Sequence, residues 1–315
     1  MTARQDVVVF SFCRHTTVTS RRNKGFAKGI SPLDNTFSLH KEFTMKFALL
    51  CAAAVTAVSL AAPVAAGDLT INGSTTVLPV VQKAGEAFMA SHPSVHLSIS
   101  GGGSGNGIKA LIEKQCDIAM SSRDIQAKEK TAAEKNGVTP QRTAIAVDAI
   151  VPVVHPDNKV GNLTVQQLAD IYAGKIKNWK DVGGDDAKIV VISRDTSSGT
   201  FESWHELIMK KARVTPAALM QASNGAVSQA VAKNRNAIGY LGLGYLNSTV
   251  KGLSVNGVKA SADTALSRQW PIARELYIFT NGAPAGDAKL FVDYLLAQDK
   301  GQKDVREVGF VPLAK

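Results

Sequence analysis

Short apolar runs alternate with amphipathic stretches along most of the chain. The runs are rich in β-branched residues and have the length of strands, whereas apolar residues in the other stretches recur every three or four positions, as in helices. Strands are expected at residues 69–71, 95–100, 117–120, 143–154, 188–192, 237–246 and 276–280. Helices are expected at residues 81–91, 107–114, 164–173, 226–233 and 288–296, and directly after Thr200. This alternation predicts an α/β fold with helices on both sides of an open sheet.

Residues 45–66 depart from this rhythm. Lys46 precedes an apolar run at residues 47–62, Pro63 ends the run, and Val-Ala-Ala follows. The run is shorter than the roughly 20 residues that a membrane-spanning helix needs. A positive start, an apolar centre and an Ala-x-Ala-like end are typical of a signal peptide, so we expect cleavage after Ala66 and a periplasmic mature protein. A buried core helix is the alternative.

Residues 1–44 are basic and show little periodicity. They precede Met45, which heads a complete signal sequence by itself. We therefore interpret them as an upstream extension that results from a misassigned start. Of the three cysteines only Cys116 lies after the signal peptide, so no disulfide is expected within the mature chain.

The composition is that of a globular protein: 315 residues, 45% hydrophobic and 20% charged, can bury a sizeable core. Residues 1–66 hold eight basic and three acidic side chains, which leaves 28 and 23 afterwards and a net charge of about +5. No basic run interleaved with aromatic residues accompanies this charge, so nucleic acid is not an expected partner. A mild preference for anions is consistent with it.

Two loops between an expected strand and the next helix are rich in hydrogen-bond donors. The first loop, residues 72–79, carries Ser74, Thr75 and Thr76; the second loop, residues 101–107, has five glycines around Ser104. A helix N-terminus offers unpaired N–H groups and the positive end of the helix dipole, and glycine lets the backbone approach a ligand closely. Both loops favour an anion, although a plain helix cap or a flexible connection would use the same residues.

The third loop, residues 194–200, gives the sharpest signal. Ser198, Gly199 and Thr200 would direct successive N–H groups at one oxyanion, and Arg194 would add a planar, two-pronged donor. An exported phosphohydrolase with Ser104 or Ser198 as nucleophile is an alternative. No recognisable general base or metal cluster supports such an enzyme, so we expect no catalytic residue and no metal site.

Further motifs accompany the loops: Ile-Tyr-Ala-Gly-Lys-Ile at residues 171–176, Asn-Trp at 178–179, Ala-Ile-Gly-Tyr at 237–240 and Val-Gly-Phe-Val-Pro-Leu at 308–313. With the loops, they make residues 67–315 resemble the phosphate-binding proteins of phosphate ATP-binding-cassette (ABC) transporters.

The resemblance implies a two-lobed periplasmic-binding-protein fold of type II, with a ligand cleft between lobes joined by two hinge strands. Lobe I would comprise residues 67–147 and 244–315, and lobe II residues 148–243. It also implies a monomer without cofactor that binds inorganic phosphate and docks on a membrane ABC permease. Another tetrahedral oxyanion, such as sulfate or molybdate, is the alternative ligand.

Residue by residue, the resemblance implies ligand contacts from Ser104 and from four residues of the third loop, namely Arg194, Ser198, Gly199 and Thr200. In the first loop the match is less clean, and we expect the Thr75 and Thr76 side chains with neighbouring backbone N–H groups, including that of Ser74, to take part.

One departure from the family concerns selectivity. Ser122 stands where well-known members carry an aspartate. Such a carboxylate accepts the proton that phosphate retains near neutral pH and repels fully ionised sulfate. Asp148 is the expected substitute, with a strand-end or hinge role as the alternative; Asp124 or a backbone carbonyl is the remaining acceptor.

Overall fold

The computed structural model describes residues 67–313, so the predicted signal peptide, its cleavage site and the upstream extension lie outside the described residues. The strands are β1 (Gly67–Gly73), β2 (Val95–Gly101), β3 (Ile118–Ser121), β4 (Pro140–Val154), β5 (Asn162–Leu163), β6 (Val190–Arg194), β7 (Leu219–Gln221), β8 (Ala237–Gly242), β9 (Lys251–Gly252), β10 (Ser254–Val255) and β11 (Ala273–Asn281). The α-helices are α2 (Leu78–Ser91), α3 (Ser104–Ile112), α4 (Ala127–Lys135), α5 (Val165–Tyr172), α6 (Gly199–Leu207), α7 (Asn224–Ala232), α8 (Ala262–Leu266), α9 (Gly286–Leu296) and α10 (Gly301–Glu307).

One long sheet organises these elements. Its strand order is β2-β1-β3-β11-β4-β8-β6-β7, and β9 pairs with β4 outside this path. The pairs at both ends, β2-β1-β3 and β8-β6-β7, are parallel, whereas β11 and β4 are antiparallel to their neighbours. None of the helices between residues 67 and 313 combines the length and apolarity that crossing a membrane requires.

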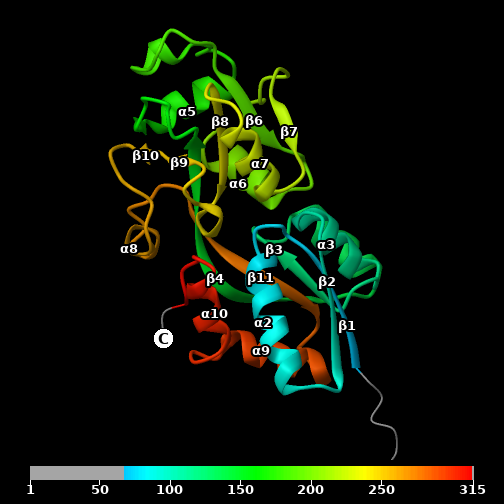
Figure 1. Ribbon diagram of the computed structural model, residues 1–315. Coiled ribbons are helices and arrows are strands. Elements are labelled where there is room, and N and C mark those ends of the chain that lie inside the picture. Colours follow the sequence, from blue (N-terminus) through cyan, green and yellow to red (C-terminus); the bar gives the residue numbers. More distant parts are fainter. Residues whose placement is uncertain (1–66, 314–315) are drawn as a thin grey trace, which may run out of the picture. The chain divides into compact units, whose positions relative to one another are not determined.

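Two main hydrophobic cores flank the long strand β4. Phe88 and Phe291 lie in the core that also holds Ile145 and Ala146, and Trp179 and Trp204 lie in the core that holds the later residues of β4. Figure 1 shows the corresponding groups of elements: α2, α9 and α10 beside β1, β3 and β11, and α5, α6 and α7 beside β6 and β8. Strand β4 therefore contributes to both cores.

The lobe limits expected from the sequence remain a proposal. The core that includes Trp204 also contains Val250, Leu253, Trp270 and Ile272. This packing favours a second boundary near residue 272, at the start of β11, rather than at residue 244.

Several elements differ from the sequence expectation. The expected strand at residues 237–246 stops at Gly242 and continues as a short 3-10 helix, Leu243–Tyr245. Helices α4, α8 and α10 were not expected. Helix α4 buries only Ala133, and α8 and α10 have five and seven residues, so none of the three shows a sustained apolar face.

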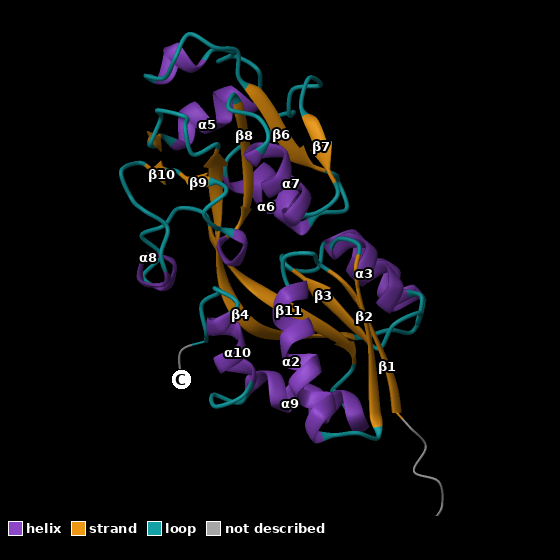
Figure 2. Ribbon diagram, in the orientation of Figure 1, coloured by secondary structure: helices purple, strands orange, loops and turns teal. Residues whose placement is uncertain are grey.

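Parallel strands bring the loops to one region. The first and second loops follow β1 and β2, Ser122 follows β3, and the third loop follows β6. In open α/β sheets the carboxyl ends of the strands are where ligands bind. In Figure 2 these connections lie between the strands of one half and helices α6 and α7 of the other.

Candidate functional site

The three loops touch one another. The hydroxyl oxygens of Thr76 and Thr200 are 2.8 Å apart, which joins the first loop to the third. The Gly105 N–H donates to the Ser197 carbonyl oxygen at 2.9 Å, which joins the second loop to the third. The site is thus assembled from elements of both cores.

Glycine is needed where these loops meet. Gly103 has a φ of 102°, and a side chain at this position would collide with Ser197. A side chain at Gly199 would collide with the hydroxyls of Ser104 and Ser122. The loops can approach this closely because both positions lack a Cβ.

Arg194, the last residue of β6, is almost completely buried, with 1% of its surface exposed. Its Nε donates to the carbonyl oxygen of Gln221 at 2.9 Å, and its Nη2 donates to the Ala222 carbonyl at 3.0 Å and to Thr75 Oγ1 at 3.3 Å. Its Nη1 is buried without a hydrogen-bond partner among residues 67–313. Burial lowers the pKa of this guanidinium, because desolvation disfavours the charged form.

The start of α6 adds donors of a second kind. Ser198 caps this helix: its Oγ accepts the Phe201 N–H at 3.2 Å, while its own proton remains able to donate. The N–H groups of Gly199 and Thr200 lie in the first turn and have no partner in the described part of the chain. Such unpaired N–H groups, with the helix dipole, attract an anion.

Two serines complete this side of the site. The Ser122 N–H donates to Ser104 Oγ at 3.0 Å, and the two hydroxyl oxygens are 3.3 Å apart. Both residues are buried. Ser74 shapes the first loop, since its Oγ accepts the N–H groups of Thr76 and Val77 at 3.1 and 3.4 Å.

Asp148 is fully buried and paired with an arginine that the sequence analysis missed. Arg274 lies directly opposite it on β11, and its Nε and Nη2 donate to Asp148 Oδ2 at 3.0 and 2.9 Å. Asp148 Oδ1 accepts the Leu243 N–H at 2.9 Å. Burial raises the pKa of Asp148, and the charge of Arg274 opposes this rise.

Arg274 links this pair to the loops. Its Nη2 also donates to Thr200 Oγ1 at 3.0 Å, and its Nη1 donates to the Gly199 carbonyl at 3.3 Å. A signal for the pair was present in the sequence: Arg274 occupies an inward position of a strand between Ile272 and Leu276, and Asp148 interrupts an apolar run. Two opposite charges within buried strands are expected to meet.

Asn224 is a second residue that the sequence analysis missed. It is buried at the start of α7, and its Nδ2 donates to Thr75 Oγ1 and Thr76 Oγ1 at 3.2 and 3.0 Å. Serine and asparagine are both preferred helix caps, so the pair Ser223 and Asn224 looks in the sequence like an ordinary helix start.

The structure thus gathers the ten predicted site residues around the meeting point of the loops, although their contact with a ligand stays a prediction. Asp124, the alternative proton acceptor, is instead exposed and forms an ion pair with Arg142 at 2.5 Å. No group of three or more histidine, cysteine, aspartate or glutamate side chains within residues 67–313 could hold a metal ion.

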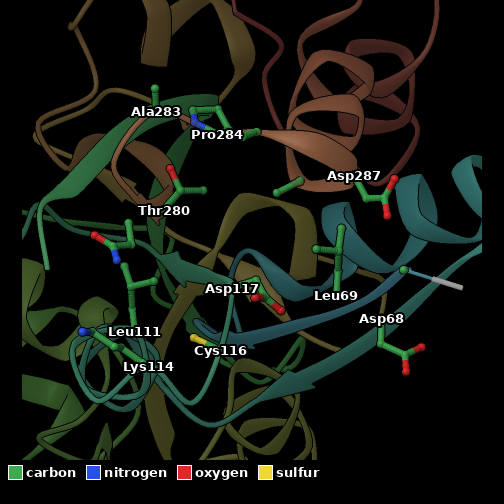
Figure 3. A pocket seen from close by; sticks show the side chains of 14 residues that line it. Asp68, Leu69, Leu111, Lys114, Cys116, Asp117, Thr280, Ala283, Pro284 and Asp287 are labelled. Carbon is green, nitrogen blue, oxygen red and sulfur yellow. The ribbon is translucent and has the colours of Figure 1, made fainter. Parts of the chain in front are cut away.

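A cavity of about 450 Å³ lies elsewhere, at the opposite end of β1. Figure 3 shows that Asp68, Asp117 and Asp287 line it together with Lys114 and Cys116. Three carboxylates against one ammonium make this cavity a poor place for an anion. Its residues belong to none of the three loops.

Comparison with known proteins agrees with this geometry. Residues 60–299 match the family model for the PBP superfamily domain. The phosphate-binding protein PstS of Bacillus subtilis is 34% identical over 250 residues, which cover 79% of this chain and 82% of that protein. PstS of Borreliella burgdorferi is 35% identical over 255 residues, or 77% of this chain and 89% of that protein.

Solved structures show the same fold. A Clostridium perfringens protein assigned as a phosphate ABC transporter substrate-binding protein, crystallised with bound phosphate, has a TM-score of 0.74 and 34% identity, covering 79% of this chain and all of that one. An ABC-type phosphate transport receptor from Vibrio cholerae has a TM-score of 0.65 and 31% identity, covering 78% of this chain and all of that one. The chain therefore has the two-lobed fold of these proteins and belongs to the PstS family of phosphate-binding proteins within the PBP superfamily.

Proposed function

We propose that this protein binds inorganic phosphate where the three loops meet and delivers it to an ABC transporter. The observation that carries the proposal is Arg194: a buried guanidinium that bonds Thr75 and whose Nη1 has no hydrogen-bond partner within residues 67–313. Leaving a buried charged donor without a partner costs free energy, and an anionic ligand would remove that cost.

The donors around Arg194 suit a tetrahedral oxyanion. Hydroxyls of Thr75, Ser104, Ser122, Ser198 and the Thr76–Thr200 pair and the backbone N–H groups of Gly199 and Thr200 form the proposed ligand set. The Ser74 N–H is not free for a ligand, because it donates to the Met120 carbonyl oxygen at 2.9 Å; Ser74 instead supports the first loop through its hydroxyl. The groups of the ligand set come from different loops, so they can approach different oxygens of one anion. Fixed dipoles of this kind stabilise charge without the rearrangement that water would need.

Asp148 is the proposed acceptor for the proton of the ligand. Its Oδ2 already accepts two bonds from Arg274 and its Oδ1 one from Leu243, which leaves one acceptor position on Oδ1. Asp148 and Thr76 both lie against Gly242. Protonated phosphate can fill that position, whereas sulfate has no proton to give.

The cellular setting is also part of the proposal. The signal-like residues 45–66 and the PstS relatives support export to the periplasm, where a monomer would dock on a membrane permease. The relatives support a role in binding and transport rather than catalysis.

Calorimetric titration with phosphate, sulfate, arsenate and molybdate tests this function. Wild-type protein is expected to bind phosphate, and Arg194→Ala is expected to bind it at least about 30-fold more weakly, because one charged partner of a buried pair is lost. Arg194→Lys should rescue only part of the loss, since an ammonium lacks the two-pronged geometry.

Arg235→Ala is the matched control, because Arg235 carries the same charge on a side chain that is 71% exposed. Wild-type phosphate affinity in a well-folded Arg194→Ala protein would remove the third loop from the site. In the same titrations Asp148→Asn should lower the ratio of phosphate to sulfate affinity; an unchanged ratio would exclude Asp148 as the proton acceptor.

A further inference from the structure

Asn224 lies between two hydroxyls of the first loop, and its orientation is determined by its surroundings. The Gly242 N–H donates to Asn224 Oδ1 at 3.2 Å. A backbone N–H can only donate, so the amide oxygen must face Gly242 and the NH₂ group must face Thr75 and Thr76. Asn224 is fully buried, and the two N–H bonds of its Nδ2 are both used, one by each threonine.

The Thr75 hydroxyl has both acceptor positions filled. Its Oγ1 accepts one bond from Asn224 Nδ2 at 3.2 Å and one from Arg194 Nη2 at 3.3 Å. A hydroxyl has two lone pairs and one proton. The proton is therefore the one group with which Thr75 Oγ1 can bind a ligand.

The hydroxyls of Thr76 and Thr200 form a pair with the same property. Thr76 Oγ1 accepts from Asn224 at 3.0 Å, and Thr200 Oγ1 accepts from Arg274 at 3.0 Å. One hydroxyl must donate to the other across the 2.8 Å between them. Arg274 Nη2 also donates to Thr76 Oγ1 at 3.5 Å, so both acceptor positions of Thr76 are filled and Thr76 is the hydroxyl that donates. The Thr200 proton is then left over, and the pair faces a ligand as a donor.

We infer that Asn224 is a positioning residue that makes both hydroxyls of the first loop obligate donors, Thr75 to an oxyanion directly and Thr76 through the Thr200 hydroxyl. Arg274, held by Asp148, does the same for Thr200. An ionised phosphate oxygen only accepts hydrogen bonds, whereas a free hydroxyl can orient either way. Because neighbouring N–H groups occupy the lone pairs of these hydroxyls, their protons already point toward the ligand position before the ligand binds. The inference rests on the proposed phosphate binding and extends it to residues outside the three loops.

Two substitutions at Asn224 separate polarity from packing. Asn224→Asp keeps the shape but replaces the NH₂ group by an acceptor, so the threonine protons would turn toward the carboxylate. Phosphate affinity should then fall at least about 100-fold, because charge-assisted bonds from two hydroxyls are lost. Asn224→Ala leaves the hydroxyls free to rotate toward the ligand, and the loss should be about 10-fold.

The order of the two effects is the readout. A residue that served only to pack α7 against the first loop would give the opposite order, with truncation to alanine worse than the isosteric aspartate. Ser223→Asp is the control for charge alone: it adds the same charge one residue away, keeps a good helix cap and touches neither threonine. The fold-loss of phosphate affinity in Ser223→Asp should be less than a tenth of the fold-loss in Asn224→Asp.

Circular dichroism and thermal melting of each variant establish that it is folded, and Asn224→Ser replaces any variant that is not. With Thr75→Val as background, Asn224→Ala should cost less affinity than in wild type, since one of the two hydroxyls that Asn224 bonds is gone. Two results would overturn the inference: affinity losses of Asn224→Ala and Thr75→Val that add fully, or a larger loss in Asn224→Ala than in Asn224→Asp. If wild type still bound phosphate, the proposed function would stand in either case. If wild type bound no phosphate, the proposed function itself would fail.

Discussion

Two buried arginines at the site differ in one respect. Arg274 in β11 faces a carboxylate directly across the sheet, whereas Arg194 at the end of β6 forms no salt bridge within residues 67–313. Burial lowers the pKa of both guanidinium groups. Backbone carbonyls of Gln221 and Ala222 orient Arg194 without neutralising it.

The comparison shows how the fold separates two tasks. Arg274 and Asp148 together carry no net charge, so they can be buried as a permanent part of the structure. Arg194 retains its charge and an unused donor. Its counterion is therefore expected to come from outside the protein.

The largest expected effect on stability comes from breaking the ion pair between Asp148 and Arg274. Asp148→Asn leaves Arg274 buried without its carboxylate, so the free energy of unfolding should fall by about 3 to 5 kcal/mol. Denaturant unfolding of the phosphate-free protein measures it. A loss below about 1 kcal/mol, the range of exposed ion pairs, would mean that water or another group neutralises Arg274.

Replacing Arg194, which has no carboxylate partner among the described residues, should change the free energy of unfolding less. Arg194→Met removes a buried charge but also the bonds to two carbonyls, so the phosphate-free free energy of unfolding should stay within about 1 kcal/mol of wild type. Added phosphate should raise the melting temperature of wild type more than that of the variant at the same concentration, because the stabilisation depends on the affinity of the folded state for the ligand. A variant as unstable as Asp148→Asn would erase the distinction between the two arginines.

A third arginine extends the comparison. Arg123, after β3, bonds both carboxylate oxygens of Glu129 at 2.7 and 2.8 Å and also forms an ion pair with Glu202 on α6. This second pair joins the two halves of the site. Glu202→Gln leaves Glu129 in place, so stability should change by no more than about 1 kcal/mol, while phosphate release becomes a few-fold faster.

Stopped-flow release measurements test this last prediction, with Glu206→Gln as control. Glu206 lies one turn further along α6, is exposed and forms no ion pair among the described residues. Equal release rates in both variants and in wild type would show that the bond between Arg123 and Glu202 does not retain the ligand.

The sequence predicted the α/β alternation and the third loop because these depend on local features: apolar periodicity, and a capping serine before a glycine. Arg274 and Asn224 were missed because their partners lie at long distances in the chain; the sequence showed that Arg274 is an inward charge, but not which residue it faces. Arg274 meets Asp148 across 126 residues, and Asn224 reaches Thr76 across 148. Strand register and helix docking determine such contacts, and a single stretch of sequence contains neither.

The shared strand β4 also has a consequence for how the chain folds. Residues up to Ala149 pair with β11, and those from Ile150 onward pair with β8. Neither core can be completed without this one strand, and β11 returns to it from far along the chain. Such non-local pairing slows folding, since long loops must close before contacts form. It also couples the two cores, so the protein should unfold in one cooperative transition rather than half by half.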